Sequence, residues 1–371
     1  MSKEKVAFVI HPSDLGLLIK GVREMKPEKK YAPELMLKFF EWVEPFKHKE
    51  FTGLSFDGKK KVDGAMFMVP FLPEMKDHAL SKVIAMVEKT LDMARREGCT
   101  VAAMAGFTSI VIQGLEAELS RKYNIRITSG NTTTAAVIVR SVEDLCKKFK
   151  VKLNDSNLAI IGASGDIGYG CFLYFAEKVN KLWLTARGLA ALENRVAPAL
   201  GFLDGDIELT TDNAKAVKAS NIVICVTSAY STIFDLKDFS PGTIVCDASA
   251  PENVETHGKL RPDVFLYHGG IAALPFEVDF GLNAGLASTK HLHGCQTEGI
   301  LNALDPEIPC SVGRGNISQY RIEDIIKRMD KAFRFAPAYS IGAKHYTEEE
   351  LGGYAAHLKN KIAGKRSTSA V

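Results

Sequence analysis

Residues 158–179, LAIIGASGDIGYGCFLYFAEKV, join an apolar strand, a glycine-rich turn and a helix in immediate succession. From Ala163 the turn follows the pattern A-x-G-x-x-G, in which few Cβ atoms let backbone amides approach a pyrophosphate. The positive end of the following helix would favour the negative charge of such a ligand. A purely structural turn is the alternative. The stretch predicts a dinucleotide site formed by Gly162, Ala163, Ser164, Gly165, Asp166, Ile167 and Gly168.

The sequence around this turn alternates short apolar runs with helical or loop segments. Five runs rich in Ile, Val and Leu have this form: NLAIIGAS, KLWLTAR, NIVICVTS, GTIVCDAS and VFLYHGG. Such runs are typical of parallel strands buried on both faces, and the segments between them have the character of βαβ connections. Together they predict an α/β protein with a Rossmann-type parallel sheet.

The character of the sequence changes on either side of this region. We predict an N-terminal mixed α/β substrate-binding domain at 1–150, a Rossmann domain at 151–285, and a helical C-terminal part at 286–371. The C-terminal part carries Cys295, which the pattern places on the first turn of a helix.

The end of the second Rossmann strand indicates which nicotinamide dinucleotide binds. An NAD site usually has an acidic residue here, whereas the 2′-phosphate of NADPH favours an arginine. The sequence WLTARG offers Thr185 and Arg187, with no carboxylate before Glu193, and so predicts NADPH. Thr227 and Ser228, after the next strand, are candidate contacts on the nicotinamide side. A solvated cap for Arg187 and ordinary loop roles for the other two are the alternatives.

Composition narrows the classes of partner. The 371 residues include 47 lysines and arginines against 44 acidic residues, a net charge of +3 that gives no electrostatic case for nucleic acid. The seven cysteines are an odd number without CxxC spacing, and MSKEKVAFVI is not a secretory signal, so we expect free thiols in the cytoplasm. No apolar run reaches the roughly 18 residues of a membrane span, so we expect no transmembrane segment.

Six short motifs lie between residues 65 and 340. In chain order they are FLPEM (71–75), GFTSI (106–110), TSGNTTTA (128–135), IGASGDIG (161–168), YHGGI (267–271) and GCQTE (294–298). In order and approximate spacing they resemble the long-chain fatty acyl-[acyl-carrier-protein] reductases best known from cyanobacteria. GFTSI and TSGNTTTA are the more specific motifs, because many oxidoreductases share the glycine turn.

The resemblance implies NADPH-dependent reduction of an acyl thioester to a free aldehyde through an acyl-cysteine, with Cys295 as the nucleophile. It implies acyl carrier protein or coenzyme A as the acyl donor, and places Gly269 and Gly270 near the nicotinamide. Contact with a membrane surface through the lipid product is a further expectation. The substrate-binding residues that it implies are Gly106, Phe107, Thr108, Ser109, Ser129, Asn131 and Thr132. For TSGNTTTA a structural role as a helix cap is expected as well.

The proposed chemistry makes a demand on Cys295. Acyl transfer from a thioester to a thiolate is nearly thermoneutral, so one cysteine and one reduced nicotinamide suffice. A helix N-terminus or a nearby cation lowers a cysteine pKa from about 8.5, and Cys295 meets the first condition. We predict that His293 assists, which is inferred from position alone because the family more often has apolar residues where this chain has HLHG. A capping or surface role for His293 and His291 is the alternative.

Other readings of the same residues are less favoured. His291, His293 and Cys295 have no second cluster with structural-zinc spacing to complete a site, so no metal is predicted. A dehydrogenase of the shikimate or amino-acid type would transfer hydride directly, with a Lys and Asp pair in its cleft. A non-catalytic sensor of acyl groups and nucleotides would need no reactive thiol.

Overall fold

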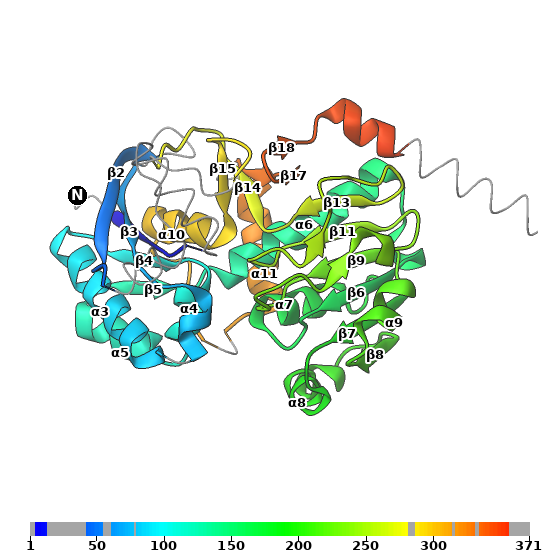
Figure 1. The fold of residues 1–371 in the computed structure, drawn as a ribbon, viewed down its shortest axis with the longest axis horizontal. Helices are drawn as coiled ribbons and strands as arrows, with labels where there is room; N and C mark the ends of the chain where they lie inside the picture. The colour runs from blue at the N-terminus through cyan, green and yellow to red at the C-terminus, as the bar shows by residue number, and fades with distance from the viewer. Residues whose placement is uncertain are drawn as a thin grey trace, which may run out of the picture. The chain divides into compact units, whose positions relative to one another are not determined.

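The computed structural model describes residues 4–12, 42–54, 61–77, 79–280, 286–313, 316–330 and 334–355 (Figure 1). The chain forms two compact units, each built from separate stretches of sequence. The first consists of Met1–Thr134, Ala272–Asn316 and Lys327–Ala336, and the second of Ala135–Ile271, Ile317–Ile326 and Pro337–Val371. Within the described ranges, no helix combines the length and apolar character of a membrane span.

The first unit is built on a five-stranded sheet with the order β2-β3-β1-β4-β5. All neighbours are parallel except β2, an edge strand that runs antiparallel to β3. The central strand β1 is apolar after Lys5, and its interior residues are fully buried. The bounds are β1 (Lys5–Ile10), β2 (Phe46–Leu54), β3 (Val62–Met68), β4 (Val101–Met104) and β5 (Arg126–Thr128).

Helix α10 (Gly294–Leu304) packs against the sheet of the first unit. Its residue Gly299 has no room for a side chain, because a Cβ there would lie 2.6 Å from the Cβ of Ala103 on β4. This close approach explains why the segment after residue 272 belongs to the first unit. The other helices of this unit are α3 (Leu80–Arg96), α4 (Phe107–Val111) and α5 (Glu116–Tyr123).

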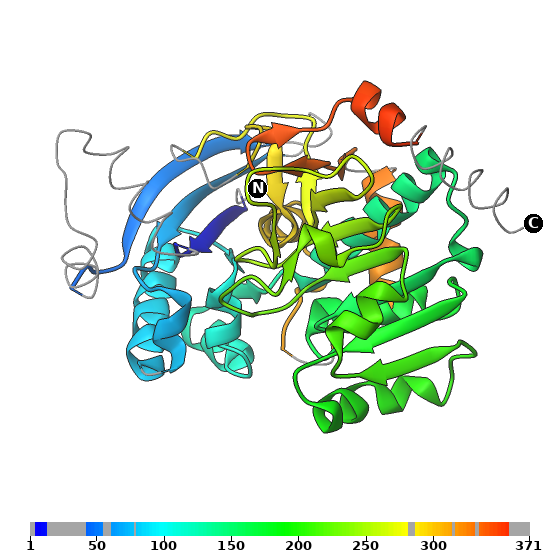
Figure 2. The same cartoon turned by 45° about the vertical axis from the view of Figure 1, so that its right-hand side comes forward.

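The second unit is a six-stranded parallel sheet with the order β13-β11-β9-β6-β7-β8, whose strands are labelled in Figure 1. Figure 2 shows the green strands of this sheet from another side. The chain starts at β6 in the middle, proceeds outward to β8, and then returns to the other side of β6, which is the strand order of a Rossmann fold. The predicted α/β fold with a Rossmann-type sheet is therefore confirmed. The bounds are β6 (Asn157–Ile161), β7 (Lys181–Thr185), β8 (Ile207–Thr210), β9 (Ile222–Cys225), β11 (Ile244–Asp247) and β13 (Phe265–His268).

Strand register aligns the loops that matter for the site. Ile161 pairs with Thr185 on β7 and with Cys225 on β9, so these strands end at the same edge of the sheet. The connecting helices are α7 (Asp166–Phe175), α8 (Leu189–Leu200) and α9 (Asn213–Lys218). Helix α6 (Asn131–Phe149) runs from the first unit into the second, and α11 (Gln319–Arg328) starts in the second.

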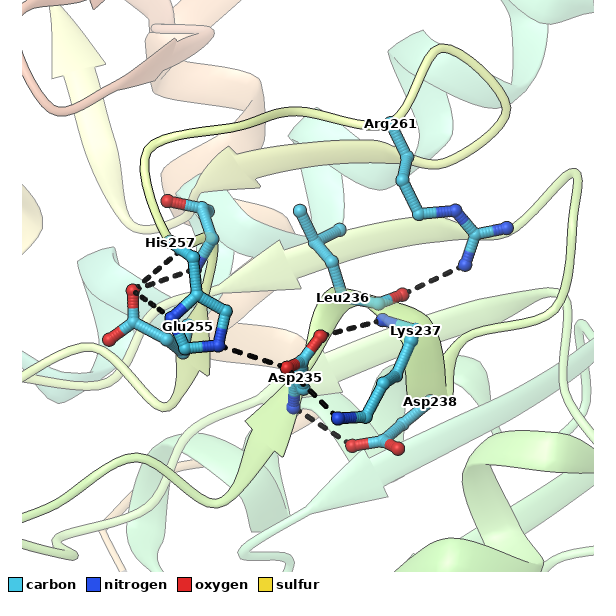
Figure 3. A network of polar contacts seen from close by, with 8 residues as sticks. Asp235, Leu236, Lys237, Asp238, Glu255, His257 and Arg261 are labelled. Atoms are coloured by element: carbon cyan, nitrogen blue, oxygen red, sulfur yellow. Dashed lines mark hydrogen bonds and ion pairs between the residues drawn. The ribbon is translucent and has the colours of Figure 1, made fainter.

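A polar network holds together the segments around the short strands β10 and β12, which lie between β9 and β13 in the sequence (Figure 3). Here β10 (Phe234–Asp235) pairs in parallel with β12 (Val254–Glu255). Asp235 accepts a hydrogen bond from the Lys237 amide and contacts the His257 ring, while Arg261 donates to the Leu236 carbonyl (Figure 3). The network satisfies backbone groups of the loop, and we assign it a structural role. The remaining short strands are β14 (Ile271–Ala273), β15 (His291–His293), β16 (Ala336–Pro337), β17 (Ser340–Ile341) and β18 (Lys344–His345).

The units differ from the division predicted from the sequence, which put boundaries at residues 150 and 285. Contacts made by α10 join residues 286–316 to the N-terminal sheet, and the first boundary falls within α6 rather than after it. The sequence gives no sign of this, because both features depend on packing between segments almost 200 residues apart.

Candidate functional site

The glycine turn between β6 and α7 needs glycine at two positions for reasons of packing. Gly162 has φ +96°, and a Cβ there would lie 2.6 Å from the Val226 carbonyl oxygen. A Cβ on Gly168 would lie 2.5 Å from the Gly162 carbonyl oxygen. Gly165 differs, since its Cβ would meet only that same carbonyl oxygen, at 3.4 Å. The protein itself leaves room at Gly165, which is where a dinucleotide turn brings its backbone closest to the pyrophosphate.

The backbone of the glycine turn is hydrogen-bonded to β7, and the N-terminal amides of α7 can donate to a ligand. The amides of Gly162 and Ala163 both donate to the Thr185 carbonyl, at 3.1 and 2.9 Å. By contrast, the first amides of a helix such as α7, including those of Ile167 and Gly168, have no acceptor within the helix. These donors lie at the positive end of the helix dipole. The residues of the turn therefore fit a dinucleotide pyrophosphate.

Asp166 makes an ion pair within the protein. Its carboxylate lies 2.9 Å from the guanidinium of Arg195 on α8, and both side chains are largely buried. The guanidinium also stacks on the ring of Tyr169, 4.0 Å from the centroid. The pair ties α7 to α8 and neutralises a negative charge that would otherwise stand at a pyrophosphate-binding helix end.

Thr185 and Arg187 have different environments at the end of β7. Thr185 is fully buried, its carbonyl holds the glycine turn, and its Oγ1 finds no hydrogen-bond partner among the described residues. Arg187 is exposed and makes no ion pair with the described part of the chain. With no carboxylate at this strand end, the residues fit a 2′-phosphate better than a free 2′-hydroxyl.

The loop after β9 is held by the protein itself. The Thr227 hydroxyl donates to Asn253 Oδ1 at 2.6 Å, and its amide donates to Ser249 Oγ at 3.1 Å. Ser228 is exposed. Thr227 therefore shapes this loop, and Ser228 is the residue of the two whose side chain reaches solvent.

The glycine pair after β13 has a packing explanation. A Cβ on Gly269 would lie 2.3 Å from Cys246 Sγ, and Gly270 has φ +70°. Both positions thus require glycine whether or not a ligand binds there.

In the first unit, Cys295 lies in the first turn of α10, where the sequence predicted it, and is partly exposed. The TSGNTTTA turn lies directly against it, because a Cβ on Gly130 would come within 2.0 Å of Cys295 Cα. Likewise, a Cβ on Gly294 would lie 2.6 Å from Thr134 Cα. The first turns of α6 and α10 are therefore packed against each other, with no side chain between them.

The GFTSI motif also reaches the thiol. The backbone of Gly106, which has φ +59° and ψ −133°, lowers the pKa of the Cys295 thiol. The hydroxyls of Thr108 and Ser109 donate to the carbonyls of Ala105 and Gly106, both at 2.8 Å, and so stabilise the turn. Three motifs that are distant in sequence therefore meet at Cys295.

A buried carboxylate joins the same segments. Glu298 of α10 accepts hydrogen bonds from the Thr128 hydroxyl, from the Ser311 amide at 2.9 Å and from the Thr133 amide at 2.9 Å. Ser311 also accepts from the amides of Ser129 and Thr132, through its carbonyl and its hydroxyl. The amides of Thr132 and Thr133, in the first turn of α6, therefore donate to side chains of the distant residues Ser311 and Glu298.

Burial raises the pKa of the Cys295 thiol to about 11. The backbone amides of Gly106, Gln296 and Cys295 lower it, and the charge of Glu298 raises it slightly. The expected effect of a helix N-terminus is present, but desolvation of the thiolate outweighs it. In this structure the resting form at neutral pH is the protonated thiol, contrary to the expectation from sequence.

The two histidines before Cys295 lie on β15, and the assisting role of His293 stays a prediction. His293 is the cap residue of α10, with extended backbone and no side-chain capping bond, and its carbonyl accepts from Thr297 Oγ1 at 3.0 Å. His291 is buried in β15. Among the residues described, no group of three or more acidic, histidine or cysteine side chains is placed to hold a metal ion.

His11, which was not predicted from the sequence, directly follows β1. Its Nε2 accepts a hydrogen bond from the Phe107 amide at 2.8 Å, next to the Gly106 backbone that contacts Cys295. A histidine after the apolar run VAFVI was the available signal. Glu298 and Ser311 were also missed. The isolated acid in the apolar helix QTEGILNAL was a signal for Glu298, whereas nothing in the sequence distinguishes Ser311.

Comparisons with known proteins identify one curated relative. The chain is 26% identical over 303 residues to the long-chain acyl-[acyl-carrier-protein] reductase of Synechococcus elongatus, covering 78% of this chain and 86% of the relative. The resemblance predicted from the motifs is therefore confirmed. No family model matches the chain.

Solved structures that match include L-tryptophan dehydrogenase from Nostoc punctiforme, at 10% identity and a TM-score of 0.39, over 98% of this chain and 89% of that one. Glutamyl-tRNA reductase from Methanopyrus kandleri matches at 13% identity and a TM-score of 0.29, over 80% of this chain and 60% of that one. These scores are low, and the Rossmann assignment depends on the strand order described above.

Proposed function

We propose that this chain is an oxidoreductase that uses NADPH to reduce a long-chain fatty acyl thioester to a fatty aldehyde, through an acyl group carried on Cys295. The observation that supports it best is that GFTSI and TSGNTTTA both lie at Cys295 of GCQTE. Three of the six motifs that carry the reductase resemblance are thus assembled around one residue. The similarity to the Synechococcus reductase supports the substrate class.

In the first step, Cys295 attacks the carbonyl carbon of the acyl thioester. The thiol loses its proton, a bond forms between Sγ and the carbonyl carbon, and the bond to the sulfur of the carrier breaks. The carrier leaves as a thiolate and takes up a proton. In our proposal, the amides of Gly106 and Gln296, which reach the thiol before reaction, also stabilise the negative oxygen that develops on the carbonyl.

In the second step, the acyl group is reduced by two electrons. Bound NADPH would supply them as a hydride to the carbonyl carbon. Cys295 then leaves as a thiolate, which releases the aldehyde, and a proton restores the thiol. The roles of Cys295 are therefore to hold the acyl group and to act as the leaving group.

We propose that the glycine turn holds the cofactor with its backbone amides and that Arg187 binds the 2′-phosphate. Arg187 is exposed at the correct strand end. Within the glycine turn, Ser164, Asp166 and Ile167 would act through the backbone, since the Asp166 side chain is already paired with Arg195. We further propose contacts to the nicotinamide from Ser228 and from the backbone of Gly269 and Gly270.

We propose acyl carrier protein as the acyl donor, because it appears in the name of the Synechococcus relative. Acyl-CoA carries the same kind of thioester and serves as a probe. We propose a cytoplasmic location because none of the seven cysteines forms a disulfide.

Intact-protein mass spectrometry tests the proposal. The protein is mixed with a long-chain acyl thioester in the absence of NADPH, and we expect a mass increase of one acyl group that is discharged as aldehyde when NADPH is added. Cys295→Ala should abolish the adduct and leave NADPH binding unchanged. Cys310→Ala is the matched control, because Cys310 is the other partly exposed cysteine, and it should keep the adduct.

Three outcomes would contradict the proposal. An adduct that persists in Cys295→Ala would assign the nucleophile elsewhere. NADPH binding and substrate oxidation or reduction without any adduct would favour direct hydride transfer, and NADPH binding without turnover would favour a sensor.

A further inference from the structure

The histidine at the end of β1 is oriented by two hydrogen bonds to backbone groups. His11 Nε2 lies 2.8 Å from the Phe107 amide nitrogen, and His11 Nδ1 lies 2.7 Å from the Pro12 carbonyl oxygen. An amide can only donate, so Nε2 must be the acceptor and the ring proton must be on Nδ1. The contacts themselves thus determine the tautomer.

Packing around the ring keeps the imidazole neutral. His11 stacks on Phe71, with centroids 4.6 Å apart, and meets the Phe107 ring edge-on at 5.9 Å. Burial lowers the pKa of His11 to about 4, against a smaller opposite effect of the Pro12 carbonyl. At neutral pH, Nε2 is therefore available as an acceptor, and protonation would set its N–H against the Phe107 amide.

The amide that His11 binds lies next to the backbone that contacts Cys295. Gly106 directly precedes Phe107, and its backbone lowers the pKa of the Cys295 thiol. The ring also lies against Gly106, because a Cβ there would come within 2.8 Å of His11 Nε2. With φ +59° and ψ −133°, this peptide has a conformation that glycine can adopt and that needs an external restraint to stay fixed.

We propose that His11 is a positioning residue for Cys295: as a neutral acceptor it holds the Gly106–Phe107 backbone so that the Gly106 amide stays directed at the cysteine sulfur. The imidazole does not touch the thiol and takes no proton from it, since its lone pair is occupied by Phe107. This inference deepens the proposed function, because it concerns the nucleophile of that reaction.

Alkylation of Cys295 by iodoacetamide measures the effect without any acyl substrate. His11→Phe keeps an aromatic ring against Phe71 and removes the acceptor, and His11→Leu is a second acceptor-free variant in case the first does not fold. His11→Gln places a carbonyl oxygen close to the position of Nε2. His257→Gln, at an exposed histidine of the second unit, is the control. The modified cysteine is identified by peptide mapping.

We expect the alkylation rate at pH 8.5 to fall about tenfold in the acceptor-free variants, as is typical when a hydrogen bond to a charged group is lost. The rate profile should move to higher pH by about one unit. His11→Gln should recover most of the wild-type rate, and the control should match wild type. Glu298 on the same helix and His293 before it, the nearest ionisable groups in sequence, are unchanged in every variant.

An unchanged rate in a folded acceptor-free variant would overturn the proposal, as would an equal loss in His11→Gln and His11→Phe. Failure of both acceptor-free variants to fold would assign His11 to the stability of the unit and equally overturn it. The result is separable from the proposed function. If alkylation shifts while no acyl adduct forms, the positioning role stands and the reductase reaction falls, and the converse outcome removes only the positioning role.

Discussion

Replacement of Glu298 by Gln tests the polar network that joins α10 to the TSGNTTTA turn. One carboxylate oxygen serves the Thr128 hydroxyl and the Ser311 amide, and the other serves the Thr133 amide. A glutamine can keep the first pair with its oxygen, but its NH2 group then faces the Thr133 amide, donor against donor. Glu298 is 1% exposed, so water cannot replace the lost acceptor.

The expected cost is about 3 kcal/mol of unfolding free energy. A hydrogen bond to a charged group contributes about 1.5–3 kcal/mol, and leaving a buried amide unsatisfied costs about 1–3 kcal/mol, two terms that overlap in part. Urea titrations followed by circular dichroism would measure the loss. Glu307→Gln is the control, since Glu307 is exposed nine residues away and its loss should stay within about 0.5 kcal/mol.

The same variant should not slow alkylation of Cys295, because the Glu298 charge raises the thiol pKa and its removal acts in the opposite direction. Glu298→Gln should thus lower the unfolding free energy without lowering the alkylation rate of Cys295. A loss below about 1 kcal/mol would refute the reasoning about the network. A large loss of alkylation rate in the folded variant would instead show that the carboxylate helps to activate the thiol.

Three further predictions concern the glycine turn and the two ionisable groups. Gly165→Ala should fold normally, since its Cβ meets nothing closer than 3.4 Å, yet it should bind NADPH at least tenfold more weakly. Gly168→Ala should instead destabilise the turn itself. Melting temperatures and NADPH titrations of the two variants would show a failure of either expectation. Alkylation of Cys295 in the free protein should rise about tenfold per pH unit between pH 7 and 9, because the pKa of about 11 keeps the thiolate a small fraction, and a plateau in that range would contradict the burial argument. Burial lowers the pKa of His11 from its ordinary value of 6.5 to about 4, so the unfolded chain binds more protons between these values. The unfolding free energy should therefore fall by up to about 3 kcal/mol from pH 6.5 to 4, and this contribution should be missing in His11→Phe.

The sequence predicted the Rossmann unit well because its signal is local. The apolar runs that match β6, β7, β9, β11 and β13 are largely buried, and the loops that follow them bring the candidate cofactor contacts to one edge of the sheet. Strand β8, IELT, was not predicted, because all four of its residues are only partly buried and no apolar run marks it. An edge strand is specified by its neighbour β7 more than by its own composition.

The Cys295 site was predicted only in part because its assembly is not local. The helix start at Cys295 and the motifs around it were visible in the sequence, but not the contacts of Gly130 and Gly106 with the cysteine. The predicted direction of the shift in the Cys295 pKa was wrong for the same reason. A helix N-terminus can be predicted from spacing, whereas desolvation depends on the segments that cover the thiol, and burial had the larger effect.

A raised thiol pKa is compatible with acyl transfer when both partners are considered. The nucleophilicity of a thiolate increases with its pKa, and exchange favours departure of the sulfur with the lower pKa. A Cys295 thiolate with a pKa of about 11 would therefore pass its charge downhill to a carrier thiol, for which the pKa of about 8.5 of an ordinary alkyl thiol is the reference. The free-energy cost of acyl transfer then lies mainly in deprotonation of the Cys295 thiol, which is the step that the amides of Gly106 and Gln296 favour. Once the acyl group is in place the sulfur carries no charge, so burial no longer opposes it, and the same burial limits the access of water to the thioester before reduction.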